Sequence, residues 1–154
     1  MPQPIISARK VTQNIQIHQQ NLTILKDIDL EIAQGEQIAI TGRSGSGKST
    51  LLGILATLDQ ASSGELIVCG QAVHSLSEEQ RAQVRLENIG FVFQSFLLVP
   101  TLTAQENVML ALSVNGRGNA DTAREWLDRV GLGHRVHHTP RQLSGGEQQR
   151  VALA

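Results

Sequence analysis

The sequence predicts an α/β fold in which a part that mixes strands and helices precedes a mainly helical part. Residues 27–32 alternate acidic and apolar side chains, which is typical of a strand with one face in water. Residues 38–40 are apolar on both faces and lead into glycines, which predicts a buried parallel strand. After the glycines, Leu51, Leu55 and Leu58 recur at helical spacing. Together they predict a strand, a glycine-rich loop and a helix.

Further elements of the first part follow in chain order. Gly64 and Gly70 bracket a short apolar run that predicts a strand. Ser77 and Gln80 have the spacing of a capping box, and they predict a helix that runs to about Leu86. Residues 89–93 are again apolar and predict one more strand.

The pattern changes after Gln94. Thr103 and Glu106 form a second capping-box pattern, which predicts another helix. A further helix is predicted to end at Gly131 and to pack Trp126 into the core. Residues 95–142 therefore read as mainly helical.

Composition narrows the class of protein. The chain has 154 residues, 40% of them apolar and 18% charged, which is typical of one globular domain. Its formal net charge of -1 predicts no nucleic-acid partner. The single cysteine, Cys69, forms no internal disulfide and is interpreted as a buried strand residue, which favours a reducing cytoplasm. No run approaches the length of a membrane span, and the N-terminus lacks a signal peptide, so membrane association is expected only through a partner.

Residues 42–49 fit the phosphate-binding pattern G-x-x-x-x-G-K-[ST] at every fixed position. The glycines let the backbone bring successive N–H groups against phosphate oxygens, and the following helix points its positive end at the same anion. Lys48 would add a full charge at the outer phosphates, and the Ser49 hydroxyl suits Mg²⁺. A glycine-rich turn without a ligand is the alternative, but chance produces this pattern in under roughly one in a hundred chains of this length.

A second candidate site begins at Leu143 and ends at Arg150. Ser144 and Glu147 form a third capping-box pattern, and two glycines lie between them at the start of a predicted helix. An ordinary capped helix is the simpler interpretation of the capping box alone. The nearby His134, His137 and His138 lack the cysteines or helical spacing of a zinc site and are interpreted as solvated.

Residues 143–150 resemble the signature motif of the ABC transporter ATPases, and Gln94 resembles the Q-loop glutamine of that family. Residues 90–96, 100–102 and 106–108 are most similar to the lipoprotein-release and macrolide-export branch, whose ATPases pair with FtsX-like permeases. The resemblance implies a P-loop NTPase (ABC ATPase) core with a helical subdomain, incomplete at the C-terminus. Residues 1–94 would form the nucleotide-binding core, 95–142 the helical subdomain and 143–154 the signature motif with the start of its helix.

The resemblance also implies an energy-coupling subunit that binds ATP and Mg²⁺ and drives a membrane permease. The residues expected to bind the nucleotide are Gly42, Arg43, Ser44, Gly45, Ser46, Gly47, Lys48, Ser49, Thr50 and Gln94, with Ser49 and Gln94 at the Mg²⁺. The residues expected to contact the ATP of the other copy in a head-to-tail homodimer are Ser144, Gly145, Gly146 and Glu147. Such a subunit is cytoplasmic and peripheral on the inner membrane through its permease.

The sequence departs from the family pattern at two places. Where the family stacks an aromatic side chain on adenine, this chain has Ile15, with His18 as the alternative, and it contains no tyrosine. The family's catalytic Glu and switch His follow the signature helix, in which this sequence ends at Ala154. We therefore expect no catalytic residue for hydrolysis within these residues. A strand that the family places beside the P-loop strand is also absent, which predicts poor stability of this piece alone.

Two alternatives to a transporter subunit stay open at this point. One is a fragment that only binds nucleotide or has no function. The other is a non-transport ABC ATPase acting on DNA or ribosomes, although such proteins usually carry long insertions or a second cassette.

Overall fold

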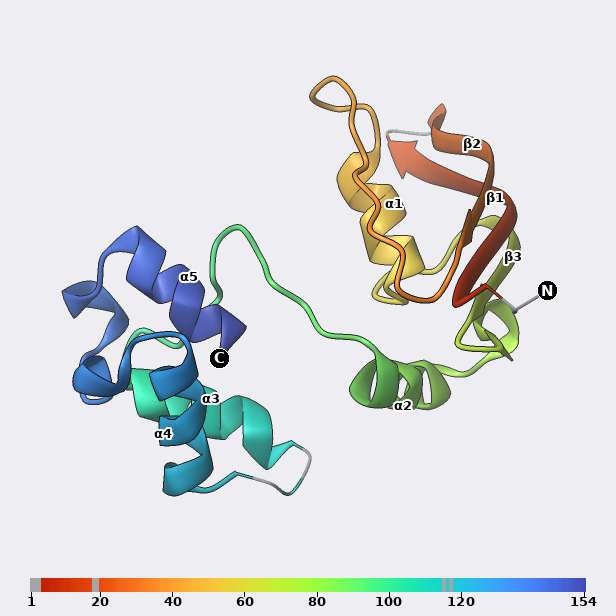
Figure 1. The fold of residues 1–154 in the computed structure, drawn as a ribbon. Coiled ribbons are helices and arrows are strands. Elements are labelled where there is room, and N and C mark those ends of the chain that lie inside the picture. The colour runs from red at the N-terminus through yellow and green to blue at the C-terminus, as the bar shows by residue number, and fades with distance from the viewer. Residues whose placement is uncertain (1–3, 18–19, 115, 117) are drawn as a thin grey trace. The chain divides into compact units, whose positions relative to one another are not determined.

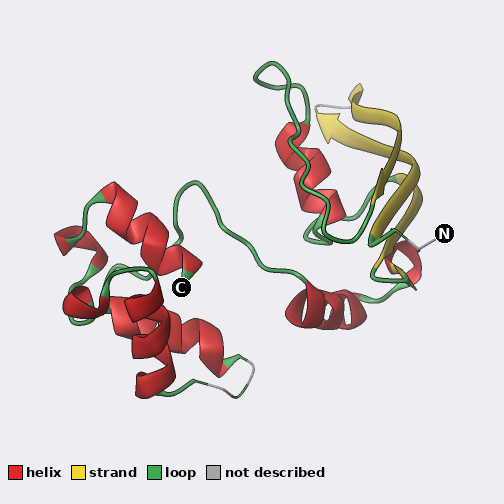
Figure 2. Ribbon diagram, in the orientation of Figure 1, coloured by secondary structure: helices red, strands yellow, loops and turns green. Residues whose placement is uncertain are grey.

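The computed structural model describes residues 4–17, 20–114, 116 and 118–154, so His18 lies outside the described residues. The chain divides into two compact units, Met1–Gly90 and Phe91–Ala154, and the change of unit falls inside the segment 89–93. Figure 1 traces both units by residue number, and Figure 2 shows that the strands belong to the first unit.

An antiparallel sheet forms the frame of the first unit. Strands β1 (Ile6–Ile17) and β2 (Gln20–Ile32) pair as a hairpin, and β3 (Ser63–Val68) pairs with the other edge of β1. With β4 (Gln71–Ala72) the order is β2-β1-β3-β4. The sheet, the helices α1 (Lys48–Leu55) and α2 (Glu78–Asn88) and the short 3-10 helix η1 (Val73–Ser75) share one apolar core. The strands predicted around residues 27–32 and 64–70 are confirmed.

The second unit packs three α-helices around a core of its own. They are α3 (Ala104–Ser113), α4 (Ala120–Arg129) and α5 (Gly145–Leu153), with 3-10 turns η2 (Gly133–Arg135) and η3 (Pro140–Gln142) before α5. The buried residues of this core are Ala104, Val108, Ala123, Leu127, Leu132, Val136, Leu143 and Val151.

Helix starts follow the predicted capping chemistry. Ser77, Thr103 and Ser144 each form a complete capping box at the start of α2, α3 and α5. Gly131 follows α4 with a φ of 75°, a left-handed conformation that ends a helix at little cost only for glycine. These helix predictions are confirmed. They could be made from the sequence because each signal involves residues that lie within one turn of the helix end.

The two predicted strands at residues 38–40 and 89–93 are wrong for this chain, in which both segments are irregular. A parallel strand exists only where neighbouring strands accept and donate its backbone hydrogen bonds. Among the described residues no such partner lies beside either segment. An open groove of about 500 Å³ within the first unit is instead lined in part by Ile38, Ile40 and Ile89 of these segments, together with Ile5, Leu52 and Leu55.

Two single-residue predictions are also corrected. The Trp126 side chain is 39% exposed, and the Arg129 guanidinium lies 4.6 Å from its ring centroid. Helix α4 buries Ala123 and Leu127, four residues apart, so Trp126 falls at the border of the buried stripe. Cys69 is half-buried in the turn after β3, with a φ of 48°, rather than inside a strand.

The open groove predicts how a polypeptide of residues 1–154 behaves alone. It should bind a hydrophobic dye and self-associate, because Ile38 and Leu52 are largely exposed beside the groove's other apolar residues. The substitution Leu52→Gln should weaken dye fluorescence with little change in unfolding free energy, since the Leu52 side chain is 54% exposed. A monomeric elution profile with cooperative unfolding and no dye binding contradicts this expectation.

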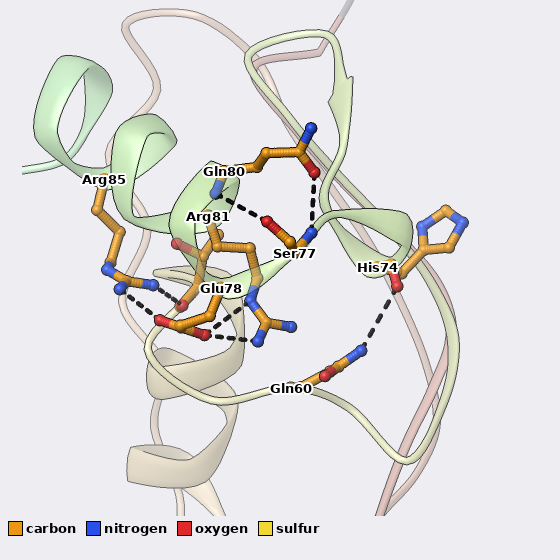
Figure 3. Close-up of polar contacts among 8 residues, drawn as sticks. Gln60, His74, Ser77, Glu78, Gln80, Arg81 and Arg85 are labelled. Atoms are coloured by element: carbon orange, nitrogen blue, oxygen red, sulfur yellow. Dashed lines mark hydrogen bonds and ion pairs between the residues drawn. The ribbon is translucent and has the colours of Figure 1, made fainter.

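An ionic cluster fastens α2 to the loop that follows α1 (Figure 3). The Glu78 carboxylate accepts from Arg81 Nη2 at 2.6 Å and from Arg85 Nη2 at 2.7 Å. Arg85 Nη1 donates to the Thr57 carbonyl at 2.6 Å, which joins the cluster to the end of the α1 segment. Hydrogen bonds from Arg85 and then Arg81 hold the pKa of the Glu78 carboxyl below its usual range.

This lowered pKa fixes the sign of a pH dependence. The stabilisation from Glu78 is complete above the pKa of about 4.3 in the unfolded chain and is lost as pH falls through the lower folded-state pKa. The substitution Glu78→Gln should therefore lower the melting temperature at neutral pH, and the difference should shrink near pH 3. Thermal unfolding at both pH values measures it, with Glu125→Gln on exposed α4 as the control. An equal difference at both pH values contradicts the ionic origin.

Candidate functional site

The loop of residues 42–47 runs directly into α1 and is mostly exposed. The backbone φ values are 154° at Gly42, 79° at Gly45 and 84° at Gly47, and residues other than glycine rarely adopt them. Gly47 is the N-cap residue of α1, and no side chain caps the helix there. The loop is therefore a turn with exposed backbone that leads directly into the first turn of α1.

The start of α1 offers backbone donors without acceptors. The first bond into the helix is from Leu51 N to Gly47 O at 2.8 Å. Within the described part of the chain, nothing accepts from the N–H groups of Lys48, Ser49 and Thr50, and the first turn contains no acidic residue. Free N–H groups and the positive end of the helix dipole suit an anion such as a phosphate.

Lys48 turns back over the loop that precedes it. Its Nζ donates to Gly42 O at 3.0 Å and to Arg43 O at 2.7 Å. An ammonium group has three N–H donors, so one remains for a ligand while two hold the loop. The Ser49 side chain is exposed at the same helix start, which leaves its hydroxyl accessible to a metal ion.

The signature residues form the start of α5 in the second unit. Glu147 Oε2 accepts from Ser144 N and from Ser144 Oγ, each at 2.8 Å, and Glu147 N donates back to Ser144 Oγ at 3.3 Å. The bonds from Ser144 N–H and then Ser144 Oγ lower the pKa of the Glu147 carboxyl, with smaller contributions from Arg135 and Arg150.

The two glycines of this helix start are not required by the local fold. Neither Gly145 nor Gly146 has a positive φ. An added Cβ would meet nothing within 4 Å at Gly145, and only Arg150 Nη1 at 3.9 Å at Gly146. The space above both residues is therefore open, and a group from outside can approach the backbone closely.

The structure brings residues 42–50 together in the first unit and residues 144–147 together in the second. Gln94 belongs to the second unit, where it lies in an exposed turn between Phe93 and Phe96. Ile15 is partly exposed on β1, opposite Leu22 of β2.

The histidines differ in environment. His134 and His137 are exposed, whereas His138 is half-buried with its Nε2 3.1 Å from Arg135 Nη1, so it is not a solvated residue. In the described ranges no group of three His, Cys, Asp or Glu side chains is placed to hold a metal ion. Nor does any helix in those ranges have the length and apolar character needed to cross a membrane.

Sequence reasoning did not find Arg135 as part of the signature region. Its Nε lies 3.6 Å from Glu147 Oε1, although twelve positions separate the two residues in the sequence. No spacing rule for a single helix or strand connects them, so only the folded chain reveals the contact.

A family model described as ABC transporter matches residues 25–154. Among curated proteins, the chain is 49% identical over 153 residues to the uncharacterized ABC transporter ATP-binding protein YbbA of Escherichia coli (strain K12). That match covers 97% of this chain and 67% of YbbA. The chain is also 49% identical to the lipoprotein-releasing system ATP-binding protein LolD of Shewanella oneidensis, over 85% of this chain and 58% of LolD.

This chain is also similar to solved structures of an ATP-binding cassette. A dimeric, post-hydrolysis structure of the ATP-binding cassette MJ0796, bound to ADP and Pi, superposes with a TM-score of 0.87 at 39% identity. It covers 96% of this chain, which spans 67% of the MJ0796 chain. A second dimeric MJ0796 structure superposes with a TM-score of 0.86 at 40% identity.

Proposed function

Because this chain belongs to the ABC transporter family of ATP-binding domains, we propose that it binds ATP with Mg²⁺ at residues 42–50. We further propose that residues 144–147 bind the ATP held by a second copy. The observation that supports this best is a pair of uncovered helix starts, one in each unit. Among the described residues nothing accepts from the first N–H groups of α1, and the glycines of α5 leave open space. Each start is suited to phosphate oxygens.

The residues at the first start fit the charge of a nucleoside triphosphate. Lys48 places an ammonium group at the loop and α1 has no acidic residue in its first turn, so the local charge favours an anion. Ser49 and Gln94 would both be ligands of the Mg²⁺. Gln94 would also signal to a membrane subunit whether nucleotide is bound. The nucleotide supplies binding energy that closes two copies on each other.

The partners proposed are a second copy of the chain and a membrane permease of the FtsX-like or macrolide-export type. The MJ0796 cassette forms dimers, and LolD is named for a lipoprotein-releasing system. Head-to-tail pairing would bring the α5 start of one copy to the nucleotide of the other. The subunit would then be cytoplasmic and peripheral on the inner membrane, through the permease.

Binding and pairing are tested on the full-length protein that contains this segment. Calorimetry with ATP and Mg²⁺ measures binding, and sedimentation with ATP or ADP measures pairing. We expect ATP-dependent dimers of the wild type. The variant Gly145→Asp should bind ATP normally and stay monomeric, since its site has room for a side chain but the new carboxylate repels phosphate.

Three other outcomes are informative. Dimers of Gly145→Asp as stable as those of the wild type would refute the head-to-tail arrangement. ATP binding without any pairing favours a module that only binds nucleotide. Absence of ATP binding in the wild type removes the proposal altogether.

A further inference from the structure

The signature helix carries a negative charge at the end that is proposed to receive a phosphate. Glu147 lies in the first turn of α5 and its lowered pKa keeps it ionised at neutral pH. The capping box accepts Glu or Gln at this position, so capping alone does not require the charge. A carboxylate free to rotate here would compete with phosphate for the N–H groups and repel it.

Two groups hold this carboxylate, one at each oxygen. Glu147 Oε2 accepts from Ser144 N and Oγ at 2.8 Å, and Glu147 Oε1 lies 3.6 Å from Arg135 Nε. The second contact is an ion pair beyond hydrogen-bonding distance, and Arg135 Nε is buried without a hydrogen-bond partner in the described part of the chain. A buried donor without an acceptor favours approach of the nearest carboxylate oxygen.

Arg135 itself is placed by the core of the second unit. It ends η2 between the buried residues Leu132 and Val136, and its Nη1 lies 3.1 Å from His138 Nε2. The next residues are bonded to the start of α3, from Gln105 N to Val136 O at 3.0 Å and from Ala104 N to His138 O at 2.8 Å. The backbone next to Arg135 is therefore anchored to a different helix, and the guanidinium itself contacts the His138 ring.

We propose that Arg135 is a positioning residue for the signature motif: it holds the Glu147 carboxylate back against Ser144, so that the start of α5 stays open to the phosphate of the partner's nucleotide. The expected consequence, a tighter ATP-dependent dimer, rests on the proposed function. The restraint of Glu147 by Arg135 does not, because it is a property of the nucleotide-free chain.

A double-mutant cycle separates a role of Arg135 that acts through Glu147 from one that does not depend on Glu147. In the full-length protein, Arg135→Gln should weaken the ATP-dependent dimer by roughly fivefold when residue 147 is Glu. In a Glu147→Gln background the same substitution should weaken the dimer by less than about twofold, because a neutral amide forms no ion pair with Arg135. Binding of ATP to the first unit should be unchanged by Arg135→Gln. The variant Arg135→Lys keeps the charge without the planar fork and should restore part of the loss.

A second readout needs no nucleotide. The Ser144 amide, which donates to Glu147, should exchange its hydrogen faster in Arg135→Gln than in the wild type, and this increase should vanish in the Glu147→Gln background. Equal effects of Arg135→Gln in both backgrounds, in dimerisation and in exchange, overturn the proposal. If the wild type binds no ATP or forms no dimer, the proposed function fails while the exchange experiment still decides the role of Arg135.

Discussion

Replacing Lys48 with alanine is expected to weaken ATP binding by roughly 100-fold, about 3 kcal/mol, because charge-assisted hydrogen bonds to phosphate are lost. Lys48 also holds the loop through its bonds to Gly42 O and Arg43 O. The variant therefore loses both the charge and part of the loop's order. Calorimetric titration of the full-length variant with ATP and Mg²⁺ measures the change.

The control for Lys48→Ala is Arg124→Ala, which removes one positive charge from the exposed surface of α4 in the second unit. Its ATP affinity should stay within about twofold of the wild type, since the charge of an exposed surface side chain is screened by salt. If both variants lose the same affinity, the effect reflects net charge. If Lys48→Ala binds as tightly as the wild type, residues 42–50 are not the main phosphate site.

Gly47→Ala is expected to damage both stability and nucleotide binding. Gly47 has a φ of 84°, and an added Cβ would lie 2.9 Å from Leu25 Cδ2 and 3.1 Å from Ile24 O. Backbone strain and overpacking together should lower the free energy of unfolding by roughly 2–4 kcal/mol. Because Gly47 caps α1 and accepts the bond from Leu51 N, the displaced backbone also moves the phosphate donors. Denaturant unfolding and ATP titration measure the two effects.

Gly45→Ala is the matched control for Gly47→Ala. Gly45 has a similar φ of 79°, but an added Cβ there would meet nothing within 4 Å. Only the cost of the left-handed conformation should remain, about 1 kcal/mol. Equal losses of stability in the two variants would show that backbone conformation, and not contact with Leu25 and Ile24, makes glycine necessary at position 47.

The sequence alone was sufficient for the features that depend on nearby residues. The capping boxes at Ser77, Thr103 and Ser144 start helices where predicted, because a side chain three residues from its partner closes both bonds within one turn. The loop of residues 42–49 was likewise predictable, since its glycines and Lys48 act within one short loop that leads into α1. The family followed from the same local motifs and agrees with the family model over residues 25–154.

The tertiary structure decided the features that depend on neighbours distant in the chain. Residues 38–40 have the composition of a buried strand, but strand formation needs backbone partners, and no described segment supplies them. Trp126 has helical spacing with core residues, yet the angular width of the buried stripe on α4 leaves it partly exposed. Arg135 lies 3.6 Å from Glu147 in a fold where the segment after η2 is hydrogen-bonded to the start of α3. Such contacts are set by packing between elements, and no short pattern in the sequence encodes their distance.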